Sequence, residues 1–289
     1  MVDQTAIEHI TARVGDLPAM PAVVSEVLRI TEDAATTMAE VSRSIETDPA
    51  LTAKILRVSN SAYYGMRQYV GTLKLALVIL GVREVRNIVL GISVFDTLKD
   101  QQGDVRVGQE VWDASLRVAS IAKKLGTEMG LGLQGEEFIT GLLTDIGKIV
   151  LLRHDPRSYS PIYDQFKNEP EELCKKEIDA FGCAHADVAT ALTVKWNLPP
   201  AISDALWHQY PDPRRPLTEA EDAKLAAVVR LAKWAAHDDF SEAGQPRCLQ
   251  DTEAWELLST VKHPILEKDR HAVLEAFLEV LKEAPRIEL

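Results

Sequence analysis

The spacing of apolar residues is the feature that most constrains how this chain can fold. Apolar side chains recur at three- and four-residue steps in nearly every long segment, which is the pattern of a helix that buries one face. Between residues 138 and 150 they are Phe138, Leu142, Leu143, Ile146, Ile149 and Val150. The sequence contains neither a convincing alternating strand nor an Asn-Gly hairpin. It therefore predicts an all-α protein.

Residues that start or stop helices stand where these periodic segments begin and end. Asp48 precedes Pro49, which is the combination of an N-cap with a proline in the first helical position. Thr218 and Glu221 have the spacing of a capping box ahead of the apolar segment that follows. Residues 197–200 include two prolines, which predict the end of one helix and the start of the next.

The polar segment 99–104 divides the chain most naturally. We expect an N-terminal helical bundle over residues 1–100 and a larger helical domain over residues 104–289. The larger domain includes extra C-terminal helices, and the last is predicted at residues 267–284, where apolar positions line one face.

Composition excludes several classes of protein. The longest apolar run, residues 73–82, is interrupted by Lys74 and is far shorter than the roughly 20 residues that cross a bilayer. The first residues have no secretory signal pattern. Cys174, Cys183 and Cys248 form no CxxC pair, so neither a disulfide framework nor a structural zinc site is expected. These features favour a soluble, cytoplasmic protein.

The distribution of charge leaves one alternative open. The formal net charge is −12, which argues against bulk affinity for nucleic acid. Residues 51–90 nevertheless carry six basic residues against one acidic residue, Glu84; the basic residues are Lys54, Arg57, Arg67, Lys74, Arg83 and Arg86. Residues 80–90 could be a recognition helix or a core helix with its arginines in solvent. A steep salt dependence of binding would identify a nucleic-acid-binding regulator.

Several strings resemble the HDOD family, whose name stands for HD-related output domain. They include LPAMPAVVSEVLRI, DPALTAKILRVSNSAYYG and GLLTDIGK, and the likeness extends over about residues 17–236. The second string is specific to that family, whereas the third is shared with the wider HD phosphohydrolases. The resemblance implies an HD-type helical domain behind an N-terminal bundle. It also implies a role in bacterial signal transduction, frequently downstream of a receiver domain.

The same resemblance implies where a metal site would lie and what has replaced it. Catalytic HD enzymes hold metal with a His on an early helix, a His-Asp pair, a late Asp and often further His residues. The corresponding positions here are Ala114, Thr144, Asp145, Lys233, His185 and His208. The ligand set is therefore incomplete. We expect no metal, no cofactor and no catalytic residue, because hydrolysis at neutral pH needs a metal-bound hydroxide.

Lys233 suggests a sharper hypothesis for Asp145. If the fold places the two side chains together, the ammonium can supply the counter-charge that a buried carboxylate requires. The alternative is that Lys233 extends to solvent and Asp145 stays partly hydrated. His185 and His208 have plain alternatives as well: His185 orders the first turn of a helix, and His208 packs at a helix end.

The SNSAYYG segment is the other candidate site. Asn60, Tyr63, Tyr64 and Gly65 could form a binding turn. Alternatively, Gly65 is a helix C-cap and the two tyrosines pack on the second domain.

These observations predict a non-catalytic signalling module that acts through a surface where the bundle meets the HD-like domain. Its partner would be a signalling protein of a bacterial two-component or similar pathway, and a small ligand could fill the former active-site cavity. Nucleic acid and membrane are not expected as partners. The alternatives are a metal-dependent phosphohydrolase acting on a nucleotide and the nucleic-acid-binding regulator.

Overall fold

A computed structural model describes most of the chain, and helices are the only regular elements in the part that it describes. The described residues are 17, 19–32, 35–60, 66, 68–98, 104–133, 135–237 and 246–259, with residues 8, 12, 13 and 270. The predicted all-α fold is confirmed. The helices belong to two compact units, a smaller unit within residues 19–99 and a larger unit within residues 100–281. Each unit is described by itself.

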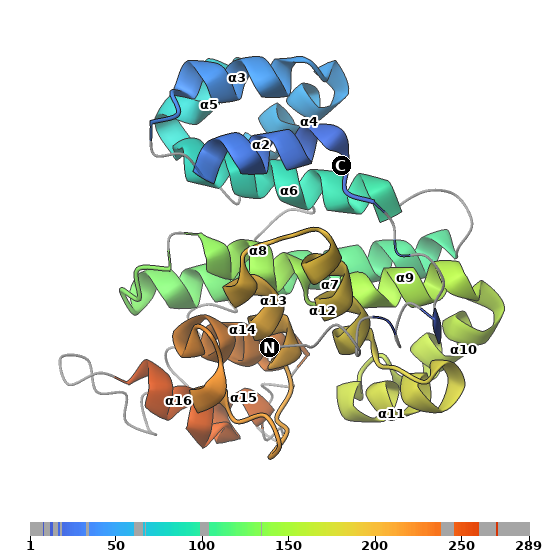
Figure 1. Ribbon diagram of the computed structural model, residues 1–289. Coiled ribbons are helices and arrows are strands. Elements are labelled where there is room, and N and C mark those ends of the chain that lie inside the picture. Colours follow the sequence, from blue (N-terminus) through green and yellow to red (C-terminus); the bar gives the residue numbers. More distant parts are fainter. Residues whose placement is uncertain are drawn as a thin grey trace. The chain divides into compact units, whose positions relative to one another are not determined.

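The smaller unit is a bundle of short helices around a common apolar core. The helices are α2 (Ala22–Glu32), α3 (Met38–Glu46), α4 (Pro49–Ser59), α5 (Leu73–Leu80) and α6 (Val82–Leu98). The longest of them, α6, lies against α2, α4 and α5 (Figure 1). Asp48 accepts the N–H of Leu51, with Pro49 in the first turn of α4, so the predicted N-cap is confirmed.

The burial of α5 and α6 bears on the nucleic-acid alternative. Along α6, Val85, Ile88 and Val89 are buried, whereas Arg83 is exposed. This burial makes α6 a core helix of its unit. The apolar segment of α5 is not wholly buried, because the side chain of Val78 is 62% exposed.

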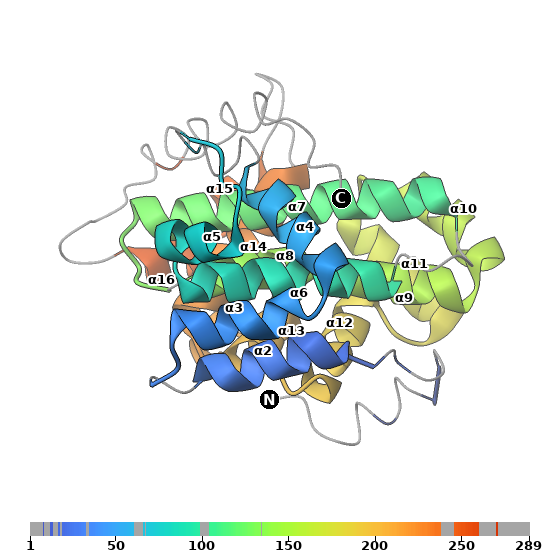
Figure 2. The same cartoon turned by 90° about the horizontal axis from the view of Figure 1, so that it is seen from above.

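The larger unit is built around α14 (Ala223–His237). Its other helices are α7 (Val105–Glu128), α8 (Glu136–Leu143), α9 (Ile146–His154), α10 (Pro156–Phe166), α11 (Pro170–Phe181), α12 (His185–Lys195), α13 (Pro200–Trp207), η1 (Leu217–Glu219), α15 (Arg247–Gln250) and α16 (Thr252–Leu258). Helix α14 packs against α7, α8, α13 and α16, and its residues 225–235 are all buried (Figure 2). Any charged side chain on the inner turns of α14 must therefore find its partner inside the protein.

Two predicted helix ends can be compared with the structure. The turn at residues 197–200 is confirmed, since α12 ends at Lys195 and α13 begins at Pro200. The capping box at Thr218 is wrong, because Thr218 lies in η1. Asp222 caps α14 instead, since its Oδ1 accepts the N–H groups of Lys224 and Leu225 at 3.0 Å each. The helix expected at residues 267–284 lies outside the described residues apart from Arg270.

The larger unit also takes in residues that precede the smaller unit in the sequence. Leu17 is buried, and its carbonyl accepts a hydrogen bond of 2.6 Å from Lys195 Nζ. The described residues before 19 therefore lie with the larger unit and not with the N-terminal bundle expected over residues 1–100. None of the helices described here has the length and apolar character that a membrane span requires.

A glycine sets the distance between α9 and α12. A Cβ added to Gly147 would lie 1.9 Å from the carbonyl oxygen of His185 and 3.0 Å from the backbone nitrogen of Ala189. Only a residue without a side chain allows this approach. Because Gly147 lies two residues after Asp145, the same contact brings Asp145 to the start of α12.

We expect Gly147→Ala to destabilise the protein by about 3 kcal/mol or more, because the clash is with backbone that cannot move aside. Gly108→Ala is the matched control, since a Cβ on this helical glycine would meet nothing within 4 Å. The control should be neutral or stabilising by about 0.5–1 kcal/mol. Urea unfolding of both variants measures the difference; equal stabilities would show that the close approach does not exist.

Candidate functional site

Asp145 is a buried carboxylate held by two lysines. It lies between α8 and α9, has no exposed side-chain surface and makes no capping hydrogen bond to α9. Its Oδ1 is 2.5 Å from Lys233 Nζ and 2.8 Å from Lys148 Nζ. The predicted ion pair between Lys233 and Asp145 is therefore confirmed. Lys148 was missed, although it stands three residues after Asp145 and so on the same side of the helix.

The two lysines decide the protonation state of this carboxylate. Burial by itself raises the pKa of Asp145, but the neighbouring charges of Lys148 and Lys233 outweigh burial and hold that pKa well below its usual range. Burial lowers the pKa of Lys233 to about 8, against the opposing attraction of Asp145. Within the described part of the chain, Asp145 Oδ2 is buried and receives no hydrogen bond. The site is thus an ionised carboxylate with more positive than negative charge around it.

His237 adds a neutral group to the same region. It is the last residue of α14, one turn after Lys233. Burial, together with the charges of Lys233 and Lys148, lowers the pKa of His237 to about 3. No role for His237 was predicted, because an isolated histidine near a helix end has no distinguishing sequence pattern.

His185 lies between Asp145 and a second buried carboxylate, Glu177. It is the first residue of α12, and its backbone N–H and ring Nδ1 both lie close to Glu177 Oε2, at 2.8 and 2.6 Å. The ring Nε2 is 3.0 Å from the hydroxyl of Tyr210 and 3.8 Å from Asp145 Oδ1. Burial lowers the pKa of His185, so the ring is neutral. It then donates from Nδ1 to Glu177 and accepts at Nε2 from Tyr210.

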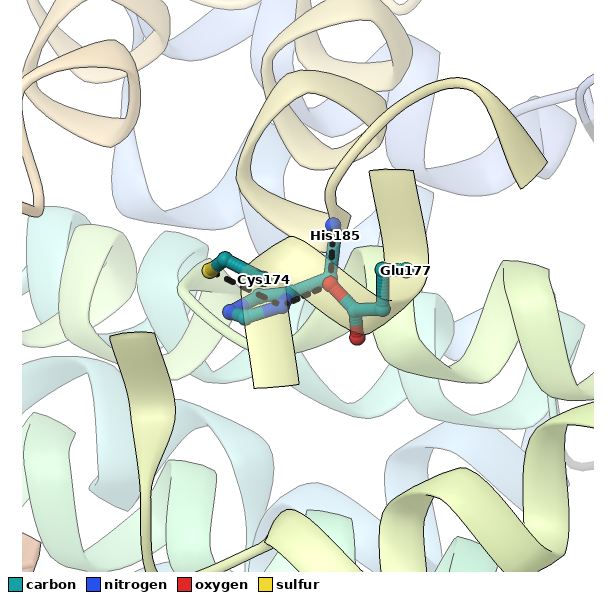
Figure 3. A group of neighbouring side chains, drawn as sticks. All are labelled: Cys174, Glu177 and His185. Atoms are coloured by element: carbon teal, nitrogen blue, oxygen red, sulfur yellow. Dashed lines mark hydrogen bonds and ion pairs between the residues drawn. The ribbon is translucent and has the colours of Figure 1, made fainter. Parts of the chain in front are cut away.

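Glu177 is held in place by a third group as well. The hydroxyl of Tyr159 donates to Glu177 Oε1 at 2.8 Å, and both residues are fully buried. The sulfur of Cys174, one helical turn before Glu177 on α11, is 3.9 Å from His185 Nδ1. Figure 3 shows the Cys174 sulfur and the Glu177 carboxylate on either side of the His185 ring. These contacts join distant segments of sequence, so spacing alone did not reveal them.

The remaining predicted site residues supply no carboxylate or imidazole at Asp145. Ala114, on α7, has only a methyl group. The hydroxyl of Thr144 is buried and donates to the carbonyl of Gly141 at 2.8 Å. His208 is also buried, but its Nδ1 lies 2.8 Å from the backbone carbonyl of Asp204. Among the described residues, no hydrogen bond or ion pair joins His208 to Asp145.

These residues do not fit a catalytic metal at Asp145. A zinc or similar ion needs at least three protein ligands. Of the described residues at the positions that the family resemblance implies, only His185 brings an imidazole or a further carboxylate within 4 Å of Asp145. The oxygen that would bind the ion already contacts both ammonium groups. A dication at that distance from two positive charges is strongly repelled at low effective dielectric.

Asn60 acts within the smaller unit. Its side-chain nitrogen donates to the carbonyls of Leu56 and Val70 at 2.7 and 2.9 Å, and its oxygen accepts the N–H of Val70 at 2.7 Å. Its amide group therefore links the end of α4 to the backbone of Val70, ten residues later. Asn60 is also the C-cap of α4, so the prediction of Gly65 as that cap is wrong. Tyr63, Tyr64 and Gly65 themselves lie outside the described residues.

Removing the charge of Asp145 should cost more than removing that of Lys233. Asp145→Asn leaves two buried ammonium groups without a counter-charge, and we expect a loss of about 3–5 kcal/mol in the free energy of unfolding. Lys233→Met should cost less, because Lys148 still pairs with Asp145. The double variant should cost less than the two single changes together.

The exposed ion pair of Arg106 and Asp164, at 2.7 Å, is the control for this comparison of single and double variants. Its coupling energy should be much smaller than that of the buried pair, because solvent screens it. Chemical denaturation of both sets of variants gives the two coupling energies. Strictly additive effects at Asp145 and Lys233 would contradict the buried pair.

Burial should make Lys233 titrate near a pKa of about 8, below the usual lysine value of about 10.5. Between these values the unfolded chain binds a proton that the folded chain does not, so this group's contribution to stability decreases as the pH falls from about 10.5 to about 8. Lys148→Met removes a like charge and should raise the pKa of Lys233. NMR titration of the lysine Cε signals, assigned with Lys233→Met, tests this; a signal at the usual value in both proteins would refute it.

Comparison with known proteins gives one family and several similar structures. A family profile described as the HDOD domain matches residues 17–211. An HDOD domain protein of unknown function from Geobacter sulfurreducens has a TM-score of 0.78 at 22% identity, covering 96% of this chain and 94% of its own. A presumed phosphohydrolase from Shewanella amazonensis has a TM-score of 0.68 at 25% identity, covering 94% and 93%.

Two further relatives are longer than this chain. A presumed signal transduction protein from Marinobacter aquaeolei has a TM-score of 0.67 at 19% identity, with coverage of 96% of this chain and 62% of that protein. An uncharacterised protein from Treponema pallidum is 25% identical over 203 residues, which are 69% of this chain and 39% of that protein. The match thus spans well under half of the Treponema protein.

Proposed function

The chain belongs to the HDOD family, and on that premise we propose that it is a non-catalytic signalling module that acts through protein–protein contact. The observation that carries the proposal is the arrangement at Asp145, whose Oδ1 contacts the ammonium groups of Lys233 and Lys148 at 2.5 and 2.8 Å. In HD hydrolases, to which this family is similar, the corresponding carboxylate binds metal.

The proposal follows from the difference between a metal ion and an ammonium group. Both neutralise a buried carboxylate. Only the metal lowers the pKa of a bound water enough to make hydroxide at neutral pH. With Ala114 and Thr144 at two further ligand positions, this chain keeps the counter-charge and lacks the source of the nucleophile. A folded helical domain without that chemistry can still present a surface to a partner.

The partner that we propose is a signalling protein of a bacterial two-component or similar pathway, in the cytoplasm. The family resemblance supports this choice, since members often act in bacterial signal transduction. Nucleic acid is not proposed, because the inner face of α6, the basic helix of the smaller unit, is buried at Val85, Ile88 and Val89.

A metal-dependent phosphohydrolase is the second candidate. It is favoured by the Shewanella amazonensis protein, which is described as a presumed phosphohydrolase and is 25% identical. The two candidates differ in the role of Asp145: a hydrolase needs its negative charge for metal, whereas a contact module needs only a folded domain.

An assay with a charge-free variant separates the two candidates. Asp145→Leu, Lys148→Met and Lys233→Met together replace the ionic cluster by apolar groups, a change that buried ion pairs often tolerate. Wild type and the triple variant are incubated with Mn²⁺ or Fe²⁺ and with nucleotides, cyclic dinucleotides and a generic phosphodiester. The proposal expects no turnover from either protein. Turnover by the wild type that the triple variant lacks would establish the hydrolase.

Contact with a partner is tested in cells. Chemical crosslinking followed by mass spectrometry should recover the same protein repeatedly with the wild type and with the triple variant. Recovery of no reproducible partner with the wild type would contradict action by contact. Recovery with the wild type alone would show that the charged cluster itself takes part in recognition.

A further inference from the structure

Cys174, Glu177 and His185 form a second cluster, distinct from the Asp145 position. Cys174 and Glu177 lie one turn apart on α11, and His185 is the first residue of α12. Their sulfur, carboxylate oxygen and ring nitrogen all lie within 4.8 Å of one another. Figure 3 shows the three side chains beside one another, with the His185 ring nitrogen in contact with both the Cys174 sulfur and the Glu177 carboxylate. We propose that these three residues bind a zinc ion.

The donor set is the one that zinc selects. Thiolate, imidazole and carboxylate are its usual protein ligands, and a tetrahedral ion separates a sulfur from a nitrogen ligand by about 3.6 Å and a nitrogen from an oxygen ligand by about 3.3 Å. Here Cys174 Sγ and His185 Nδ1 are 3.9 Å apart, and His185 Nδ1 and Glu177 Oε2 are 2.6 Å apart. Binding the ion therefore requires movements of less than about 1 Å at each ligand.

The fold fixes these groups before any metal arrives. Residues three apart on a helix share a face, so α11 presents Cys174 and Glu177 together. Helix α11 then ends at Phe181, and Gly182 turns the chain with φ 77°, which returns it to α12 at His185. Glu177 keeps its hydrogen bond from the Tyr159 hydroxyl while Oε2 turns to the ion. Such an outer hydrogen bond orients a metal-binding carboxylate.

Solvent can reach the site from one side. Cys174 is partly exposed, whereas Glu177 and His185 are fully buried. Three protein ligands leave the fourth tetrahedral position open for water or an incoming group. Cys174 is therefore the ligand nearest to solvent, and the chain surrounds the other two.

The charges of the site are balanced once zinc is bound. Zinc binding displaces the proton of the Cys174 thiol to solvent. The resulting thiolate and the carboxylate of Glu177 together cancel the charge of the ion. This balance matters because Lys148 and Lys233, the two lysines at Asp145, lie on the other side of His185. An ion held only by neutral ligands would be repelled by those ammonium groups.

Zinc at this position would also reach the Asp145 pair. With the metal on Nδ1, the single proton of the neutral His185 ring must reside on Nε2. Nε2 lies 3.0 Å from the Tyr210 hydroxyl and 3.8 Å from Asp145 Oδ1. The nitrogen that accepts from Tyr210 without metal then donates to the Tyr210 hydroxyl, whereas Asp145 Oδ1, at 3.8 Å, stays beyond hydrogen-bond distance. Zinc would therefore reverse this hydrogen bond beside the buried ion pair, and the site does not depend on the proposed signalling function.

This site has no familiar sequence signature, because zinc sites are usually recognised by paired cysteines. The ligands are spaced as Cys-x2-Glu-x7-His, with one cysteine instead of a CxxC pair. The proposal departs from the expectation, drawn from the sequence, of no metal and no structural zinc site. The proposed ion lies on Nδ1 of His185, opposite the ring nitrogen nearest Asp145.

Cobalt and zinc titrations of the full chain test the proposal. Co²⁺ should give a thiolate-to-metal charge-transfer band at one equivalent, and added Zn²⁺ should remove it. In Cys174→Ser the band should vanish and zinc affinity should fall by more than about 100-fold, beyond the 10–100-fold typical of an outer hydrogen-bond change. Cys183→Ser is the matched control, since Cys183 is buried only two residues before His185 but lies outside the cluster.

Each result bears on the metal site alone. A band kept in Cys183→Ser and lost in Cys174→Ser supports the site, and so does a zinc-dependent move of the His185 proton to Nε2 in ¹⁵N NMR. The absence of a band in the wild type, or its retention in Cys174→Ser, would overturn it. Because binding is measured and not turnover, failure here leaves the proposed signalling function unaffected.

Discussion

A carboxylate with no exposed surface needs nearby positive charge, and at Asp145 two lysines supply it. Lys233 comes from the buried helix α14, and Lys148 comes from the helix that Asp145 itself begins. The position of Asp145 depends in turn on Gly147, which lets α9 approach the backbone of His185. The ion pair and the close approach at Gly147 together join three helices of the larger unit: α9, α12 and α14. Breaking the ion pair would leave charge in the core, which costs far more than the loss of an exposed ion pair.

This arrangement shows how a buried carboxylate can be neutralised by side chains of the protein itself. A divalent metal and a pair of ammonium groups meet the same electrostatic need. The ammonium groups, however, come from side chains that fold with the protein, so the site needs no ion from outside. In the proposed function, the domain acts through its surface. The proposed zinc ion binds Nδ1 of His185, the ring nitrogen that faces away from Asp145, where a thiolate and a carboxylate can balance its charge.

Much of the architecture could be predicted from local patterns. Helical spacing gave the all-α fold, and Asp48 with Pro49 gave the start of α4, because these signals depend on neighbouring residues only. The ion pair of Lys233 with Asp145 was predicted from the family resemblance. Local patterns failed where two residues compete for one role: Asp222 caps α14 in place of Thr218. They also failed where a contact depends on the geometry of a turn, as at Glu177 and His185, which lie eight residues apart and meet through the turn between α11 and α12.

Anomalous diffraction from crystals grown with Mn²⁺ tests the central claim most directly. Manganese prefers carboxylate ligands, so it would reveal any metal-binding capacity that Asp145 retains. We predict no anomalous peak at Asp145 and both lysine Nζ atoms within hydrogen-bond distance of Oδ1. A manganese ion bound to Asp145, with Lys148 and Lys233 turned away from it, would contradict the account.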